Sequence, residues 1–173
     1  MILNVGCGHQ KSGDIRLDYS RNRGSQANII ADAHNLPFKS EVFSKVVSQV
    51  VLEHSPNPLK FLEEQYRVLK INGEIEVITD NAQYYSWSVM QPGHGGIIHE
   101  NYHDDHYMIF FPLNVERLLG KASFDSVNFK YIRMSKWMDI FALLLIRLSI
   151  WRVECLYKRF RVTAIKKELK NES

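Results

Sequence analysis

Two glycines and an aspartate near the amino end have the types and spacing of a nucleotide-binding turn. Residues 1–8, Met-Ile-Leu-Asn-Val-Gly-Cys-Gly, predict a short buried strand that runs into a turn at Gly6 and Gly8. Glycine lets the backbone turn sharply there and lets a ligand approach it closely. Asp18 ends a second apolar run, where an acidic side chain can accept hydrogen bonds from ribose hydroxyls. These residues predict a cofactor that contains adenosine.

A dinucleotide cofactor fits this spacing poorly. In the pattern G-x-G-x-x-G the third glycine lets the following helix pack on the strand, whereas Lys11 stands at that position here. Asp18 also follows Gly8 by only ten residues, and dinucleotide enzymes place their acidic residue roughly twenty residues on. The pattern therefore disfavours nicotinamide and flavin cofactors.

Carboxylates and histidines after the later predicted strands are candidates for acid–base chemistry. They are Glu53, His54, Asp80, His94, His99, His103 and His106. On a helix, His99 and His103 would share one face, which is an arrangement that can bind a metal. Pro92 and the glycines at 93, 95 and 96 favour a loop instead. We therefore predict no metal, and either an acceptor-binding loop or a plain polar surface.

The elements that must position these residues alternate along the chain. Strands are predicted at 2–6, 15–18, 28–31, 44–51, 74–79, 127–133 and 159–167. One helix is predicted to begin after Asn57 with Pro58 in its first turn and to stop at Asn72-Gly73, and another begins near Asn114. This alternation predicts one α/β domain over residues 1–173, with a doubly wound, mostly parallel sheet of seven strands.

The order of these segments resembles the class I S-adenosylmethionine-dependent methyltransferases, most closely their small type 11 branch. The resemblance covers about residues 2–133. It is carried by the segments 3–8, 17–18, 31–38, 43–48, 51–54, 61–64, 67–73, 105–106 and 110–113. The ordered combination is more specific than any single motif.

The resemblance implies a role in cofactor binding for several residues. They are Asn4, Gly6, Cys7, Gly8, Asp18, Asp32, Ala33, Gln49 and Val50. The glycines would lie against the methionine part of S-adenosylmethionine and Asp18 would bind the ribose. Asp32 would face the adenine amino group, with Ala33 donating its backbone N–H. The structural alternative is that Asp18 caps a turn and Asp32 holds an Asx-turn.

Catalytic candidates come from the same resemblance. His106 belongs to the Asp-His pair of the family's late segment, so it is the first candidate. His103 and His54 are the other two candidates. Methyl transfer is an in-line displacement in which alignment supplies much of the rate. A base is needed only where the acceptor must lose a proton early.

Two features of the sequence depart from the family pattern. Asn4 stands where the family usually has an acidic residue, so its contact with the cofactor would be weaker. Only about eight residues separate Gly6 from Ile15, and a crossover through a full helix needs roughly a dozen or more. We therefore expect a shortened or absent first helix and an open cofactor site, which a second subunit could close.

The carboxyl-terminal part carries an apolar and basic segment. An apolar helical insertion is predicted at about 136–157, between the last two strands, and is too short to span a bilayer. It could pack in the core or a homodimer, or lie on a membrane surface. Residues 147–173 hold eight Lys or Arg against three Glu, so nucleic acid is a further but disfavoured partner.

The prediction is an enzyme that transfers methyl groups from S-adenosylmethionine to a small-molecule, glycan or lipid-linked acceptor. The alternatives are an RNA methyltransferase, or a non-catalytic binding module that docks through its carboxyl-terminal helix. The first apolar stretch is only a strand long and is interrupted by Asn4, so we expect no signal peptide. We therefore expect a cytoplasmic protein, which could also contact a membrane through the apolar segment.

Overall fold

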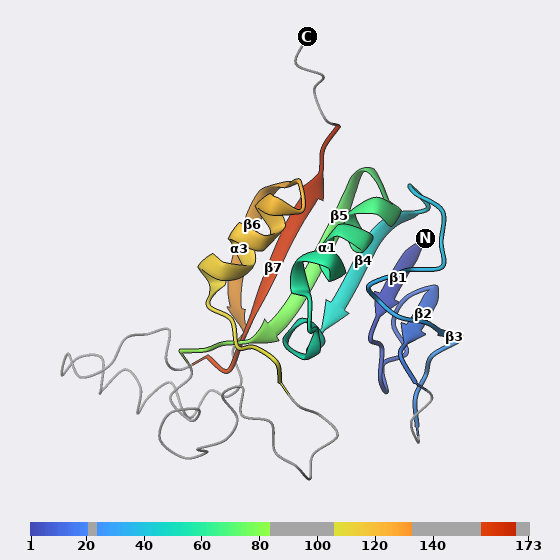
Figure 1. The fold of residues 1–173 in the computed structure, drawn as a ribbon, viewed down its shortest axis with the longest axis horizontal. Coiled ribbons are helices and arrows are strands. Elements are labelled where there is room, and N and C mark those ends of the chain that lie inside the picture. The colour runs from blue at the N-terminus through green and yellow to red at the C-terminus, as the bar shows by residue number, and fades with distance from the viewer. Residues whose placement is uncertain (21–23, 84–105, 133–156, 169–173) are drawn as a thin grey trace, which may run out of the picture.

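The computed structural model describes residues 1–20, 24–83, 106–132 and 157–168, which form one mixed sheet with helices against it (Figure 1). The strands are β1 (Ile2–Val5), β2 (Ile15–Asp18), β3 (Ile29–Ile30), β4 (Phe43–Gln49), β5 (Leu69–Asp80), β6 (Phe124–Ile132) and β7 (Arg159–Lys166). Their order across the sheet is β3-β2-β1-β4-β5-β7-β6. β7 is antiparallel to both of its neighbours, and the first five strands pair in parallel. The predicted seven-stranded, mostly parallel fold class is confirmed.

The link between β1 and β2 contains no helix. Residues 6–14 turn back through hydrogen bonds such as the one from the Asp14 backbone N–H to the Ile2 carbonyl, at 2.9 Å. The expected loss of the first helix is therefore confirmed. β1 lies between β2 and β4, so the chain leaves β1 at the point where the strand order reverses. Ligands bind at such switch points in open α/β sheets.

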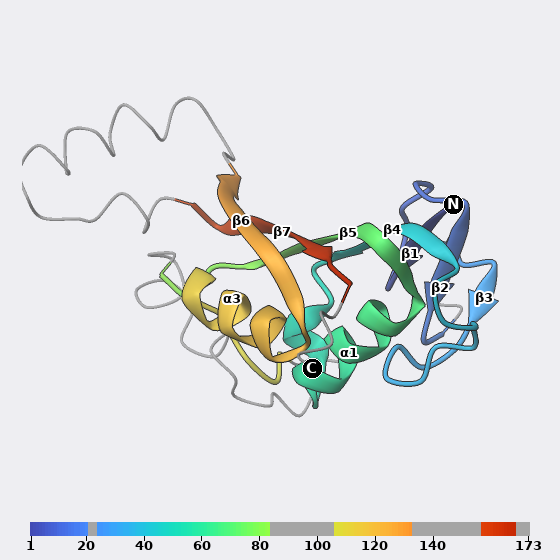
Figure 2. The ribbon, with the colours of Figure 1, turned by 90° about the horizontal axis from the view of Figure 1, so that it is seen from above.

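Both α-helices of the described residues lie on one side of the sheet (Figure 2). They are α1 (Pro58–Val68) and α3 (Pro112–Lys121), and the 3₁₀ helix η1 (Leu52–His54) precedes α1. α1 begins as predicted, because the Asn57 side chain accepts from the Lys60 backbone N–H and Pro58 occupies the first turn. Its buried face joins Val46, Ile75 and Val162 of the sheet in one apolar core.

α1 ends earlier than the sequence predicted. The helix stops at Val68, and β5 begins directly at Leu69 rather than at residue 74. Asn72, with φ +62°, and Gly73 lie within β5, where the pairing with β4 shifts register. The Asn-Gly pair therefore makes a bulge inside a strand. The Asn72-Gly73 pair does bend the chain, but the bend is a β-bulge within β5 and not the end of α1.

The opposite side of the sheet carries paired charges at its centre. Lys45 of β4 contacts Glu74 at 2.7 Å and Glu76 at 2.9 Å, and Arg161 of β7 reaches Glu76 at 3.3 Å. These residues alternate with the core residues of the same strands. No helix of the described residues covers this face, and charged side chains in ion pairs occupy the outward positions of these strands. These charged side chains can face solvent, which agrees with the missing helix between β1 and β2.

A partly buried ion pair between Glu64 and Arg67 fastens the segment after β3 to α1. The Glu64 side chain is 8% exposed and accepts from the Leu36 backbone N–H at 2.9 Å. Arg67 binds Glu64 through two nitrogens and donates to the carbonyls of Phe38 and Leu36. The Arg67 hydrogen bonds hold the pKa of Glu64 below its usual range. This network positions the stretch that begins at Asp32.

Replacing Arg67 by alanine is expected to lower the free energy of unfolding by about 2 kcal/mol, because buried Glu64 and two carbonyls lose their donors. The pKa of Glu64 is lower in the folded state than in the unfolded state, so its contribution exists at neutral pH and is lost as the pH falls. Urea unfolding of wild type and Glu64→Gln between pH 3 and 7 checks the sign. The stability difference between the two should shrink in acid, and a difference that grows in acid would refute this account.

Candidate cofactor and acceptor site

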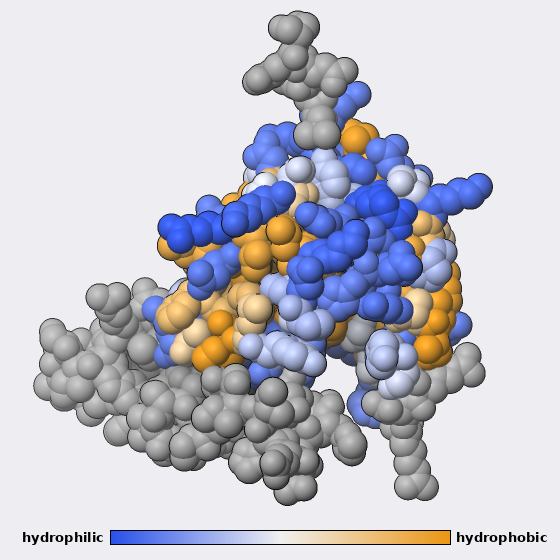
Figure 3. Space-filling view, in the orientation of Figure 1, coloured by the Kyte–Doolittle hydropathy of each residue, from blue (hydrophilic) through white to orange (hydrophobic). Residues whose placement is uncertain are grey.

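A cavity of about 920 Å³ opens at the carboxyl ends of β1, β2 and β4. It lies at the lower edge of the molecule, below α1, where the surface is hollowed (Figure 3). Six of the predicted cofactor residues line it: Gly6, Gly8, Asp18, Asp32, Ala33 and Val50. The cavity is large enough for a drug-sized ligand.

The two glycines have different reasons to be glycine. The backbone N–H groups of Gly6 and Cys7 both donate to the Leu17 carbonyl, which ties the turn to β2. At Gly6, with φ +66°, an added Cβ would lie 2.3 Å from a methyl carbon of Val51. At Gly8, with φ +49°, an added Cβ would meet no atom within 4 Å. Gly6 therefore serves packing, whereas the space at Gly8 belongs to the cavity.

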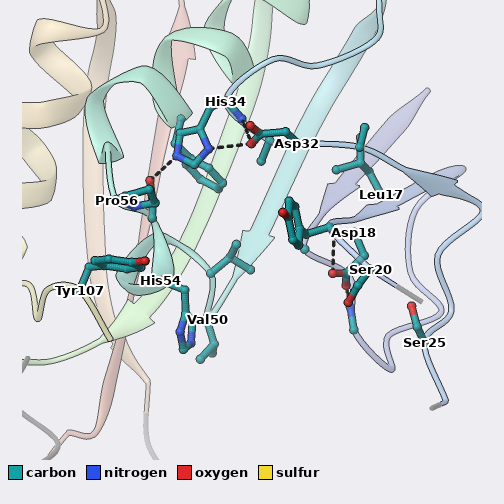
Figure 4. A pocket seen from close by; sticks show the side chains of 18 of the residues that line it. Leu17, Asp18, Ser20, Ser25, Asp32, His34, Val50, His54, Pro56 and Tyr107 are labelled. Atoms are coloured by element: carbon teal, nitrogen blue, oxygen red, sulfur yellow. Dashed lines mark hydrogen bonds and ion pairs between the residues drawn. The ribbon is translucent and has the colours of Figure 1, made fainter. Parts of the chain in front are cut away.

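Asp18 holds the glycine turn from the end of β2. Its Oδ2 accepts from the Gly8 backbone N–H at 2.7 Å, and its Oδ1 accepts from the Tyr19 N–H at 2.8 Å. The Cys7 thiol also lies 4.0 Å from Oδ2. A carboxylate offers about four lone-pair positions, so these contacts still leave acceptor capacity for a ligand. Asp18 lies on one side of the cavity and His54 on the other, with Val50 between them (Figure 4).

Asp32 belongs to a hydrogen-bonded chain of three side chains. Its Oδ1 accepts from the His34 backbone N–H at 2.8 Å and lies 2.7 Å from His34 Nδ1 (Figure 4). The Nε2 atom of the same ring lies 2.7 Å from the Ser55 Oγ. The His34 N–H groups lower the pKa of Asp32, so the carboxylate is charged at neutral pH. His34 thereby fixes Asp32 and links it to the residue after η1.

Val50 has a strained backbone at the floor of the cavity. Its φ is +58°, which a β-branched residue rarely adopts, and its N–H donates to the Ile78 carbonyl at 2.7 Å. Strain of this kind costs roughly 1–3 kcal/mol and gathers at functional sites. The chain therefore turns directly after β4, at a residue that lines the cavity.

Three predicted cofactor residues do not line the cavity. Asn4 is buried, and its amide donates to Gln10 and Ser12, so it holds the loop after β1. Cys7 is buried, and burial raises the pKa of its thiol, which agrees with a packing role. Gln49, the last residue of β4, is also absent from the lining.

His54 and Tyr107 form the far wall of the cavity from Asp18. The rings of His54 and His106 meet edge to face with centroids 4.6 Å apart. The backbone N–H of Tyr107 donates to the Glu53 carbonyl at 2.9 Å, which docks this late segment on η1. Two of the three predicted catalytic histidines therefore lie together. The third, His103, and the candidates His94 and His99 lie outside the described residues, as does most of the predicted apolar insertion at 136–157.

Among the lining residues that the sequence analysis missed are His34, Ser55 and Tyr107. His34 follows Asp32 by two residues, a spacing that could have suggested the contact because Asp side chains bond to the backbone two residues on. Ser55 and Tyr107 carried no such signal, since long-range packing brings them to the wall.

The basic residues of β7, and Lys167 directly after it, are paired within the fold. Arg159 binds Asp80, Arg161 binds Glu76, and Lys167 binds Asp125. Lys166 donates to the Leu69 carbonyl and lies over the Tyr66 ring. This part of the basic tail is therefore engaged in ion pairs and contacts within the sheet. Among the described residues, no helix is long and apolar enough to cross a membrane.

Comparisons with known proteins agree with this architecture. Residues 14–77 match the methyltransferase domain of the type 11 family. An uncharacterised protein of Methanocaldococcus jannaschii is 49% identical over 47 residues, which are 27% of this chain and 23% of that protein. The chain thus spans under a quarter of the length of this curated relative.

Solved structures share the fold. A SAM-dependent methyltransferase of Archaeoglobus fulgidus aligns over 95% of this chain and 85% of its own, with a TM-score of 0.67 and 16% identity. One from Thermotoga maritima aligns over 96% and 82%, with a TM-score of 0.67 and 17% identity. Residues 14–77 thus match a methyltransferase domain, and the chain shares the fold of these SAM-dependent methyltransferases.

Proposed function

We propose that the chain transfers a methyl group from S-adenosylmethionine to an acceptor that enters beside His54 and Tyr107. The observation that carries the proposal is the meeting of Gly8, Asp18 and Asp32 in one cavity at the switch point of the sheet. The three come from separate turns, so the arrangement is specific to the fold.

The lining fits the parts of this cofactor. Asp18 would accept from the ribose hydroxyls through charge-assisted hydrogen bonds, and Asp32 would accept from the adenine amino group beside the Ala33 N–H. The free space at Gly8 would take the methionine part. Bound S-adenosylmethionine supplies an electrophilic methyl group on its sulfonium sulfur. The chain's own task is to hold donor and acceptor in line and to exclude water.

The acceptor side is the wall that holds His54, with His106 against it. An imidazole there can take a proton from a hydroxyl or amine acceptor as it is methylated. A small molecule, or the hydroxyl-bearing end of a glycan or lipid-linked intermediate, matches an open cavity of this size. The ion pairs of β7 weigh against RNA as the acceptor.

Replacing His34 by alanine is expected to weaken S-adenosylhomocysteine binding about 3–10-fold, because Asp32 would lose the ring that orients it. The pKa of Asp32 should also rise toward its ordinary value of 3.8. Calorimetry measures the affinity, and NMR titration of the carboxyl carbon measures the pKa. Ser55→Ala removes only the far hydrogen bond and should have the smaller effect. An equal loss in both variants would contradict the role given to His34.

Transfer of a labelled methyl group tests the proposed activity. The full chain and Asp18→Ala would be incubated with tritiated S-adenosylmethionine and separate fractions of small molecules, glycans, lipids and RNA. Label in a non-RNA fraction, absent with Asp18→Ala, is the expected result. Cofactor binding without label in any fraction would overturn methyl transfer in favour of a binding module. Label in RNA would overturn the acceptor class.

A further inference from the structure

Three potential ligands converge beside the cofactor cavity, from segments distant in the sequence. Glu53 lies in η1, Asp80 ends β5, and His106 precedes Tyr107 of the cavity wall. One side-chain ligand atom from each lies within 4.8 Å of the other two. Glu53 is fully buried and Asp80 is 3% exposed, so two carboxylates face each other away from water.

One carboxylate oxygen of this cluster lacks a hydrogen bond. Glu53 Oε2 accepts from the Thr79 hydroxyl at 2.9 Å, whereas Oε1 is buried and has no hydrogen-bond partner among the described residues. Buried polar atoms are nearly always satisfied, so an orphan of this kind calls for an explanation such as an ion. The orphan oxygen belongs to the residue that faces Asp80 and His106.

The charges of the cluster also do not balance. Asp80 Oδ1 accepts from the Arg159 guanidinium at 2.9 Å, which compensates one carboxylate. Glu53 has no Lys or Arg partner among the ion pairs of the described residues. A buried carboxylate without a counter-charge is costly, because desolvation is not repaid. Within the part of the chain that the structure describes, a proton or a bound cation is left to supply the compensation.

We propose that Glu53, Asp80 and His106 bind a divalent cation. Cations with oxygen ligands have bonds of roughly 2.0–2.6 Å, so trans ligands lie about 4–5 Å apart and the observed spacing is compatible. Two carboxylates with one imidazole suit Mn²⁺ or Zn²⁺, which both accept oxygen and nitrogen ligands, better than an ion that prefers thiolates. Three protein ligands leave coordination positions open, which is typical of a catalytic rather than a structural site.

The position of the cluster beside the cavity gives the cation a role in binding the acceptor. This role rests on the proposed function. His106 contacts His54 of the cavity wall, and Glu53 holds the backbone of Tyr107. An acceptor oxygen that enters beside His54 could complete the coordination, and a cation lowers the pKa of a bound hydroxyl. The class of acceptor favoured by this site is therefore one with a hydroxyl or a pair of neighbouring oxygens.

Titration of the full chain with Mn²⁺, followed by electron paramagnetic resonance of the free ion, tests the site. Wild type should bind one Mn²⁺ at this cluster with a Kd below about 1 mM, within the range of oxygen-rich sites. Glu53→Gln keeps the shape of the side chain, and His106→Ala removes the least buried ligand. Each should weaken binding by at least about tenfold. His9→Ala removes an exposed histidine of the cofactor side and should leave Mn²⁺ affinity unchanged.

Two results would overturn the cation site. One is a folded wild type that binds neither Mn²⁺ nor Zn²⁺ at 1 mM, roughly the weak limit of protein cation sites, which would leave a shared proton as the compensation. The other is binding that Glu53→Gln and His106→Ala do not alter, which would place the ion elsewhere in the chain. S-adenosylhomocysteine affinity is measured on the same samples. If the protein binds S-adenosylhomocysteine but no cation, the cation site alone is refuted. If it binds the cation but not S-adenosylhomocysteine, the proposed function alone is refuted.

Discussion

Replacing Asp18 by alanine is expected to weaken S-adenosylmethionine binding by at least about 100-fold. The variant loses two charge-assisted hydrogen bonds to the ribose, each worth roughly 1.5–3 kcal/mol, and about 1.4 kcal/mol is a factor of ten. It also frees the Gly8 N–H, which Asp18 holds at 2.7 Å, so the glycine turn loses its anchor. Calorimetric titration of wild type and variant measures the ratio.

Asp14→Ala is the matched control for this variant. Asp14 also accepts from a backbone N–H, that of Ile2 at 2.7 Å, but it lies at the opposite end of the strands from the cavity. Its removal should leave the affinity within about twofold, since surface changes away from a site are nearly neutral. If Asp18→Ala binds as tightly as Asp14→Ala, Asp18 does not hold the ribose.

Replacing Gly6 by alanine is expected to lower the free energy of unfolding by about 3 kcal/mol. The new Cβ would lie 2.3 Å from Val51 Cγ2 and 2.8 Å from Cγ1, so either the turn or β-branched Val51 must move. Overpacking of this kind costs roughly 1–3 kcal/mol, and a non-glycine residue at φ +66° adds about 1 kcal/mol. Urea denaturation measures the loss.

Gly8→Ala separates the two contributions. Gly8 has a similar backbone, with φ +49°, but no atom within 4 Å of the added Cβ, so it should lose only about 1 kcal/mol. The double variant Gly6→Ala with Val51→Ala should recover part of the stability, because the overlapping methyl groups are gone. Equal losses for Gly6→Ala and Gly8→Ala would contradict the packing role of Gly6.

The sheet could be predicted because its signals are local. Apolar runs marked every strand within a few residues, and the short link from Gly6 to Ile15 correctly predicted the missing helix. The end of α1 was wrong because Asn72-Gly73 is a turn signal with two meanings, and tertiary pairing of β5 with β4 decided between them. The charged face of the sheet is visible in the alternation of β5, which the sequence analysis did not use.

The candidate site was predictable where its residues lie at the ends of predicted strands. Gly6, Gly8, Asp18, Asp32 and Val50 each end a strand or follow one, and all line the cavity. Asn4 was placed by family analogy, whereas its side chain bonds to the loop that replaces the helix. The cluster of Glu53, Asp80 and His106 could not be found from spacing, because three distant segments form it. The roles of all these residues stay predictions until a ligand is bound.

A second cavity on the same chain provides an internal control for ligand binding at the first. It measures about 500 Å³ and is lined by Phe111, Leu113, Phe129 and Tyr131 with four other residues of α3, β6 and their surroundings. It lacks the glycine turn and the paired acidic residues of the larger cavity. A ligand that binds by apolar contact alone would favour this second cavity.

Amide chemical shifts of the ¹⁵N-labelled chain during titration with S-adenosylhomocysteine test the central claim most directly. The account predicts saturable changes gathered at Gly6, Gly8, Asp18 and Ala33, with the signals of Phe111 and Phe129 unmoved. No change at millimolar ligand, or changes gathered at Phe111 and Phe129, would contradict the claim that this cavity is the cofactor site.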